Sequence, residues 1–170
     1  MKSLKLVFLI YAVILCGLAV SSCSQAPKDD MPQIQALEKS FLDALNAKDL
    51  NGIMSVYVPD DSLIVFDAMP PRQYIGANAY RKDWEVVMAA YPGAWHAELI
   101  DWKIDTEGSL GYGHGFFHSV ATDKDGKPAD FTVRLTDVYR KINGKWLIVH
   151  EHVSWPVDMT TGKADLTSKP

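Results

Sequence analysis

Two alternating, β-rich runs around Asn143-Gly144 constrain the fold of this chain more than any other stretch. The dipeptide is typical of a tight type I′ turn, so residues 134–154 predict a long β-hairpin. Alternation along the first arm places five side chains on one face: Phe131, Val133, Leu135, Asp137 and Tyr139. A carboxylate on an otherwise apolar face is costly unless it is paired or neutral, so Asp137 is the first candidate functional residue.

Three helical segments come before most of the strands. Apolar residues at helical spacing predict a first helix from Pro32 to about Lys48, a short second helix capped by Asp49, and a third helix after Gly76. The predicted strands are residues 63–66, 95–105, 110–122, 129–141 and 145–154. This order implies an α+β domain in which a curved antiparallel sheet wraps around three helices and leaves a cone-shaped cavity.

The first 23 residues have the features of a secretory signal peptide. Lys2 and Lys5 precede an apolar run over residues 6–20, which is short for a membrane span. The segment Val-Ser-Ser-Cys that ends at Cys23 resembles a bacterial lipobox, in which this cysteine becomes the lipidated first residue. The alternative is an ordinary signal peptide.

These features predict a lipoprotein of the cell envelope, anchored to the outer membrane and facing the periplasm. The lipid anchor is then the only contact with a membrane. The expected organisation is a signal peptide at 1–23, a tether at 24–30, one domain at 31–160 and a polar tail at 161–170.

Cysteine content and charge exclude several classes of function. If Cys16 leaves with the signal peptide and Cys23 is acylated, no thiol remains for a disulfide, thiol catalysis or a cysteine metal site. Loss of Lys2 and Lys5 leaves 15 basic against 21 acidic residues, a net charge of −6. This balance, without a basic run, argues against nucleic acid or an anionic lipid surface as the partner. Nothing in the sequence indicates a cofactor.

Four stretches carry a family resemblance: the segment Tyr57-Val-Pro-Asp-Asp61, the strand that leads to Asp67, the turn Pro-Pro-x-x-Tyr-x-Gly76, and the final run from Gly144 to Ser154. Together they resemble SnoaL-like proteins of the nuclear-transport-factor-2-like superfamily. The resemblance covers about residues 31–160 and implies the cone-shaped fold and a homodimer formed through the outer face of the sheet. Relatives include ketosteroid isomerase and the association domain of calcium/calmodulin-dependent kinase. Because this fold hosts enzymes, binding modules and assembly domains, it does not choose among them.

The resemblance to ketosteroid isomerase extends to four positions. Asp67 follows the Tyr57 segment in the register of the aspartate that moves the proton, with one residue more than the family spacing. Asp137 lies in an Asp-Val-x-Arg segment like that of the second aspartate, Trp84 matches an aromatic on the third helix, and Tyr57 matches a pocket tyrosine. The tyrosine expected on the first helix is absent, which argues against steroid isomerisation itself.

Asp67 and Asp137 together support the hypothesis of proton transfer next to a carbonyl group. Proton abstraction needs a base within reach and a hydrogen-bond donor for the enolate oxygen. Two carboxyls in unequal environments can divide these roles, as they do in ketosteroid isomerase. The structural alternative is that Asp67 caps the following proline turn and Asp137 makes a buried hydrogen bond to His114 or Tyr57.

The predicted strand at 110–122 adds candidate pocket residues. Its small residues alternate with bulky ones, so we expect Tyr112, His114, Phe116 and His118 to point into the cavity. His114 could orient an aspartate or carry a proton near neutral pH, and the alternative is a histidine bonded to a backbone carbonyl. The complete predicted lining of the ligand pocket is Tyr57, Phe66, Trp84, Tyr112, Phe116 and Leu135.

His150 and His152 form the most conspicuous polar pair of the sequence. Their i, i+2 spacing suits a metal ion, and a further acid or histidine could complete the ligand set. Alternation, however, groups them with Trp146 and Ile148 and against the valines of the same strand. If those valines share the face of Asp137, the histidines point out of the cavity. We therefore expect no metal there, and an outer surface or dimer interface.

The sequence thus predicts an exported SnoaL-like domain with an enclosed pocket for a small apolar or carbonyl-bearing molecule. The leading function is a proton-transfer isomerase or lyase that uses Asp67, Asp137 and His114. The alternative is a non-catalytic ligand-binding or dimeric assembly module.

Overall fold

The computed structural model describes residues 30–166, 168 and 170. The predicted signal peptide, the lipidation site at Cys23 and nearly all of the predicted tether lie outside these residues. In the part that is described, no helix is both long and apolar enough to cross a membrane.

Three helices form one layer of the fold: α2 (Met31–Asn46), α3 (Leu50–Met54) and α4 (Ala77–Ala90). Apolar residues recur every three or four positions along α2, and this stripe is buried: Ile34, Leu37, Phe41 and Leu45. Asp49 begins α3 by accepting a hydrogen bond from the backbone N–H of Asn51 at 3.0 Å. Gly76 precedes α4 with a φ of 85°, a conformation that glycine adopts without strain.

A six-stranded sheet forms the second layer, with its strands in the order β2-β1-β6-β5-β4-β3. The strands are β1 (Ile64–Phe66), β2 (Tyr74–Ile75), β3 (Trp95–Glu107), β4 (Leu110–Thr122), β5 (Pro128–Ile142) and β6 (Lys145–Ser154). β1 runs parallel to β6, and the other neighbouring pairs are antiparallel. Asn143 and Gly144 both have positive φ, as the predicted type I′ turn requires.

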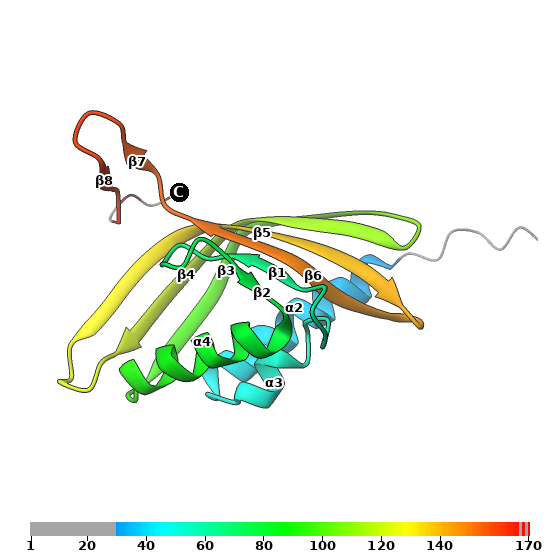
Figure 1. The fold of residues 1–170 in the computed structure, drawn as a ribbon, viewed down its shortest axis with the longest axis horizontal. Helices are drawn as coiled ribbons and strands as arrows, with labels where there is room; N and C mark the ends of the chain where they lie inside the picture. The colour runs from blue at the N-terminus through cyan, green and yellow to red at the C-terminus, as the bar shows by residue number, and fades with distance from the viewer. Residues whose placement is uncertain (1–29, 167, 169) are drawn as a thin grey trace, which may run out of the picture.

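The long strands β3 to β6 arch over the helices, so that the core fills the space between the sheet and the helical layer (Figure 1). A small hairpin of β7 (Val157–Asp158) and β8 (Lys163–Ala164) projects from the body beyond the end of β6 (Figure 1). It spans residue 160, where the sequence predicts the end of the domain. The predicted α+β fold, a curved antiparallel sheet around N-terminal helices, is confirmed.

One extra residue in β6 changes which of its side chains face the helices. Asp137 pairs with Glu151, but Tyr139, two residues later on β5, pairs with Ile148, three residues earlier on β6. This bulge shifts the alternation by one position. The predicted uniform alternation of β6 is therefore wrong, because Trp146 and Ile148 are buried in the core and so is Glu151 beyond the bulge. The histidines on either side of Glu151 face outward, as predicted.

The side of β4 that carries its glycines, rather than the side with Tyr112 and His114, faces the helices. Gly113 pairs with Asp137 and Gly115 with Leu135, and both partners on β5 point inward. The ring of Trp102 occupies the space over these glycines, because a Cβ on Gly113 would lie 2.6 Å from Cζ2 of that ring. Only a residue without a side chain leaves room for this close approach.

The residues that alternate with these glycines consequently lie on the outer face of the sheet, whereas Phe117, Ser119 and Ala121 share the inner face. The prediction that Tyr112, His114, Phe116 and His118 point into the cavity is wrong. Tyr112 is 47% exposed, and its ring stacks on that of His114 with an interplanar angle of 13°. β4 does alternate as predicted, but its inward side is the one that holds the glycines.

Candidate active site

Three buried carboxyl groups from different elements meet in the core between the helices and the sheet. Glu38 comes from α2, Asp137 from β5 and Glu151 from β6, and each is at most 4% exposed. Asp137 and Glu151 are neighbours across the two strands, and the carboxyl of Asp137 is hydrogen-bonded to those of Glu38 and Glu151. These three residues are called the carboxyl cluster below.

Three buried tyrosines donate hydrogen bonds to the outer members of the carboxyl cluster. Tyr57 and Tyr80 donate to the two oxygens of Glu151, at 2.7 and 2.5 Å. Tyr139 donates to Glu38. Burial raises the pKa of all three phenols, so they remain protonated donors.

The carboxyl cluster has to hold protons inside the core. Two carboxyl groups can hydrogen-bond to each other only if one of them is protonated. Among the described residues, no N–H or hydroxyl group donates to Oδ1 of Asp137. Burial raises the pKa of Asp137 well above its usual range, and repulsion from the two neighbouring carboxyls adds to this. Burial also raises the pKa of Glu38 and of Glu151 to about 7. Asp137 is therefore protonated, and because a carboxylic acid has a single O–H donor, its contacts with both glutamates require a second proton within the cluster.

Asp67 directly follows β1 and lies beside the carboxyl cluster. Its Oδ1 accepts a hydrogen bond from the backbone N–H of Met69 at 3.1 Å, so it caps the turn toward the prolines. Burial raises the pKa of Asp67, and the negative charge of Asp83 on α4 adds to this effect. The charge of Asp67 in turn raises the pKa of Glu151. No hydrogen bond joins Asp67 to Asp137 in the described structure, and Glu151 is the group that couples them.

An open groove of about 480 Å³ lies at the Asp67 end of the sheet. The loop after β1 and the chain from the end of β6 to the small hairpin provide its walls. Its lining includes Phe66, Asp67, Arg72, Gln73, His152, Ser154 and Trp155. This volume is within the usual range of small-molecule sites. Of the two predicted catalytic aspartates, Asp67 reaches the groove, whereas Asp137 lies in the core.

The other predicted pocket residues divide between the core and the outer side of the molecule. Tyr57 and Leu135 are buried in the core, and Trp84 packs among its aromatic rings. Phe66 instead lies on the outer side of β1, where its ring contacts two histidine rings of β6 and lines the groove. His114 is on the opposite face of the sheet from Asp137, so it does not join the site.

Glu38 and Glu151 are site residues that were not among the predicted ones. Each nevertheless has a signal in the sequence. Glu38 follows Ile34 by four positions, which places it in the buried stripe of α2. Glu151 alternates with Val149 and Val153, the same kind of pattern that marks Asp137 on β5.

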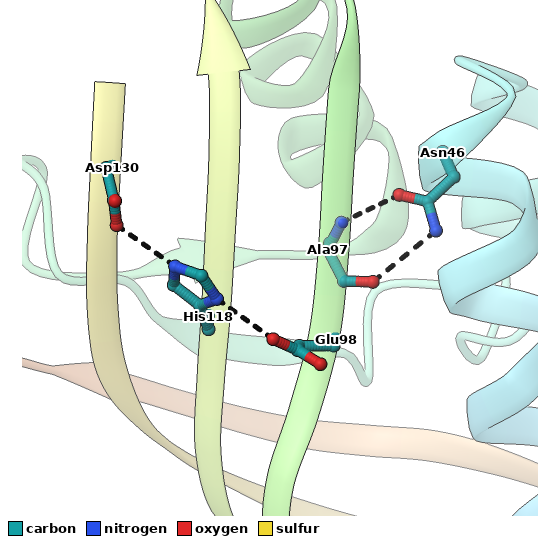
Figure 2. A network of polar contacts seen from close by, with 5 residues as sticks. All are labelled: Asn46, Ala97, Glu98, His118 and Asp130. Carbon is teal, nitrogen blue, oxygen red and sulfur yellow. Dashed lines mark hydrogen bonds and ion pairs between the residues drawn. The ribbon is translucent and has the colours of Figure 1, made fainter. Parts of the chain in front are cut away.

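A separate polar network lies on the outer face of the sheet. His118 on β4 contacts Glu98 on β3 through Nδ1 at 3.1 Å and Asp130 on β5 through Nε2 at 3.0 Å (Figure 2). Hydrogen bonds to Glu98 and then to Asp130 raise the pKa of this histidine. In the same view, the side chain of Asn46 bonds the backbone of Ala97 and ties the end of α2 to β3 (Figure 2). Both contacts join neighbouring elements outside the groove.

His150 and His152 also face away from the carboxyl cluster. Nδ1 of His150 hydrogen-bonds to the backbone oxygen of Ile64 at 2.8 Å, so this nitrogen is the donor. Within residues 30–166, no group of three or more histidine, cysteine, aspartate or glutamate side chains is arranged to hold a metal ion.

Comparison with known proteins identifies the family. The model of the SnoaL-like domain family matches residues 34–158, and no curated protein matches significantly. A nuclear-transport-factor-2-like protein of unknown function from Pseudomonas putida KT2440 is 31% identical, with 82% of this chain and 95% of that chain covered and a TM-score of 0.73.

Two more distant structures share the fold. A nuclear-transport-factor-2-like superfamily protein from Salmonella enterica is 20% identical over 79% of this chain and 96% of that chain, with a TM-score of 0.67. A ketosteroid isomerase-like protein from Erwinia carotovora atroseptica is 16% identical over 75% and 96%, with a TM-score of 0.63. With its family match over most of its length, this chain belongs to the SnoaL-like family of the nuclear-transport-factor-2-like superfamily.

Proposed function

We propose that this domain transfers a proton next to the carbonyl group of a small molecule, as an isomerase or a lyase does, with Asp67 as the base. The position of Asp67 is the observation that carries the proposal. Its carboxyl is half-buried, has a raised pKa and lines an open groove of about 480 Å³. A carboxylate in such a position is within reach of a substrate and is a stronger base than an exposed aspartate.

The reaction begins when ionised Asp67 takes a proton from the carbon next to the carbonyl group. The electrons of the C–H bond form the enolate, and Asp67 becomes a neutral acid. In an isomerase, this acid returns the proton to a different carbon. In a lyase, the enolate expels a leaving group, which receives the proton. A base whose pKa lies closer to the working pH performs both transfers more efficiently.

In this proposal, Asp137 has a positioning role in the core and does not contact the substrate. It is 1% exposed and is hydrogen-bonded to Glu151, the carboxyl on which the charge of Asp67 acts. In this proposal, protonated Asp137 maintains its hydrogen bond to Glu151 while Asp67 gains and loses its proton. The ketosteroid isomerase-like relative supports the choice of proton transfer as the type of chemistry.

We also propose that the domain works in the cell envelope, held to a membrane by a lipid on Cys23. The support is the order of the N-terminal sequence: two lysines, an apolar run over residues 6–20, and the lipobox-like segment.

The test is exchange of hydrogen for deuterium next to a carbonyl group, followed by proton NMR in D₂O across a panel of small ketones and keto acids. Asp67→Asn should slow the exchange about 100-fold or more, because a positioned general base contributes about 10²- to 10⁴-fold. Glu85→Gln, which changes an exposed carboxyl on α4, is the matched control and should leave the rate unchanged. Exchange that survives Asp67→Asn would place the base elsewhere.

The second candidate is a non-catalytic ligand-binding or dimeric assembly module. Exposed apolar side chains on the outer face of the sheet favour it, among them Ile64, Leu110 and Tyr112, which are 39–51% exposed. For such a module, no ketone in the panel exchanges faster than in buffer, and Asp67→Asn leaves the assembly unchanged.

A further inference from the structure

Four polar side chains on the wall of the groove have no hydrogen-bonding partner within the described protein. Arg72 and Gln73 belong to the loop between β1 and β2, and His152 and Ser154 to the end of β6. None of these side chains makes a hydrogen bond or an ion pair with another described residue. Polar groups that converge on a groove without internal partners are available to a ligand.

Arg72 is the charged member of this set. Its guanidinium offers a planar fork of N–H donors, which matches two oxygens of a carboxylate or a phosphate. The pKa of Asp67 is raised by burial and by Asp83, so the positive charge of Arg72 does not neutralise the base. The groove therefore presents a free cation and a separate carboxylate.

We propose that the groove binds a small carbonyl compound that also carries an oxyanion, a carboxylate or a phosphate, and that Arg72 holds this oxyanion while Asp67 faces the carbon next to the carbonyl. This inference rests on the proposed proton transfer and adds the class of substrate. Gln73 and Ser154 supply neutral donors beside Arg72, and Phe66 and Trp155 provide apolar walls for the carbon chain.

Electrostatics explains why such a ligand needs Arg72. An oxyanion that enters the groove approaches Asp67 and, behind it, Asp83 on α4. Without a cation, these carboxylates repel it. Arg72 offsets this repulsion and also the negative charge that develops when the enolate forms. A neutral ligand of the same shape meets no such repulsion, so it gains little from the arginine.

The experiment compares levulinate with methyl levulinate, two ketones that differ in the presence of a charge. Arg72→Ala should lower kcat/KM for deuterium exchange into levulinate about 10- to 100-fold, the loss expected for one charge-assisted hydrogen-bonded pair. Exchange into methyl levulinate should change less than about 3-fold, because no ion pair is lost. Arg72→Lys should restore part of the activity, since lysine keeps the charge but not the fork. Arg140→Ala changes another exposed arginine, on β5, and should have no effect.

A binding measurement distinguishes failure of this inference from failure of the proposed function. Levulinate and inorganic phosphate are titrated separately into the wild type and Arg72→Ala, with the backbone amide signals of residues 72 and 73 followed by NMR. Saturable changes that disappear in Arg72→Ala support the oxyanion site even if no exchange occurs, in which case only the proton transfer is refuted. The response to phosphate, relative to levulinate, decides which oxyanion is preferred.

Two results would overturn the oxyanion site. One is an equal effect of Arg72→Ala on levulinate and its ester, which leaves proton transfer intact but removes the role of the charge. The other is the absence of saturable changes with both levulinate and phosphate.

Discussion

The carboxyl cluster holds protons at pH values where exposed acids are ionised. Its members are Glu38, Asp137 and Glu151. Burial raises the pKa of both glutamates to about 7 and that of Asp137 well above its usual range. The folded protein therefore binds protons in a pH range where the unfolded chain has released them. Because proton binding and folding are linked, the carboxyl cluster makes stability depend on pH in the direction opposite to that of a salt-bridged acid.

We expect the free energy of unfolding to fall as the pH rises from about 5 to about 8. A glutamate with a pKa of 4.5 when unfolded and about 7 when folded stabilises the fold fully below the lower value. This contribution is lost as the pH rises through the higher value. One such difference corresponds to roughly 3 kcal/mol, and coupling within the cluster keeps the total below the sum of its members. Urea unfolding at a series of pH values measures it.

The matched variants Glu151→Gln and Glu85→Gln test the source of this dependence. The amide of Glu151→Gln does not titrate, so the slope of stability against pH should become shallower. Glu85 is exposed on α4, and its variant should keep the slope of the wild type. A free energy of unfolding that stays constant over this range would contradict a protonated carboxyl cluster.

At the scale of elements, the sheet separates two surfaces with different chemistry. The inner faces of β5 and β6 carry Asp137 and Glu151 of the carboxyl cluster, and the outer face of β4 carries Tyr112, His114 and Phe116. The charged contacts of His118 tie β3, β4 and β5 together on that outer face (Figure 2). An exposed aromatic surface on a rigid sheet is suited to contact with another protein.

We propose that this outer face forms a homodimer, and we expect Tyr112→Glu combined with Phe116→Glu to convert it to a monomer. Two buried, unpaired charges on each subunit would oppose association. Sedimentation velocity measures the oligomeric state. Val86→Glu, at an apolar residue exposed on α4, is the control and should remain dimeric. A wild-type monomer, or a dimer that the double variant leaves intact, would refute this interface.

At the scale of the whole molecule, the N-terminal end of the domain is held against the sheet. Lys141 on β5 makes an ion pair with Asp30 at 2.7 Å, directly before α2. The groove lies near the junction of the β1 loop and the projecting hairpin. A tether that enters at Asp30 would therefore join the folded domain at the start of α2, outside the residues that line the groove.

Lipidation at Cys23 predicts that Cys23→Ala moves the protein from the membrane fraction to the soluble fraction of the cell envelope. A single acylated cysteine with its lipid chains is the proposed anchor, and the variant cannot form it. Cell fractionation with mass spectrometry of the N-terminal peptide measures both location and modification. Cys16→Ala should remain membrane-bound, and an unmodified Cys23 in the wild type would show an ordinary signal peptide instead.

Local sequence patterns were sufficient to predict the main elements of the fold and one residue of the carboxyl cluster, Asp137. Helical spacing predicts α2 and α4, Asn143-Gly144 predicts the last hairpin, and alternation on β5 places Asp137 on a buried face. Each of these features depends on residues that are close in sequence, so periodicity and turn preference determine them. The family resemblance added the importance of Asp67.

Only the tertiary structure decided which faces are inside and which groups meet. Trp102 packs over Gly113 and turns the glycines of β4 inward, and the bulge in β6 brings Ile148 and Glu151 to the same side. Glu38 reaches Asp137 across about a hundred residues, and the groove forms where the β1 loop meets the end of β6. These outcomes depend on how distant segments pack against one another. An alternating pattern separates the two faces of a strand but does not determine which face is buried.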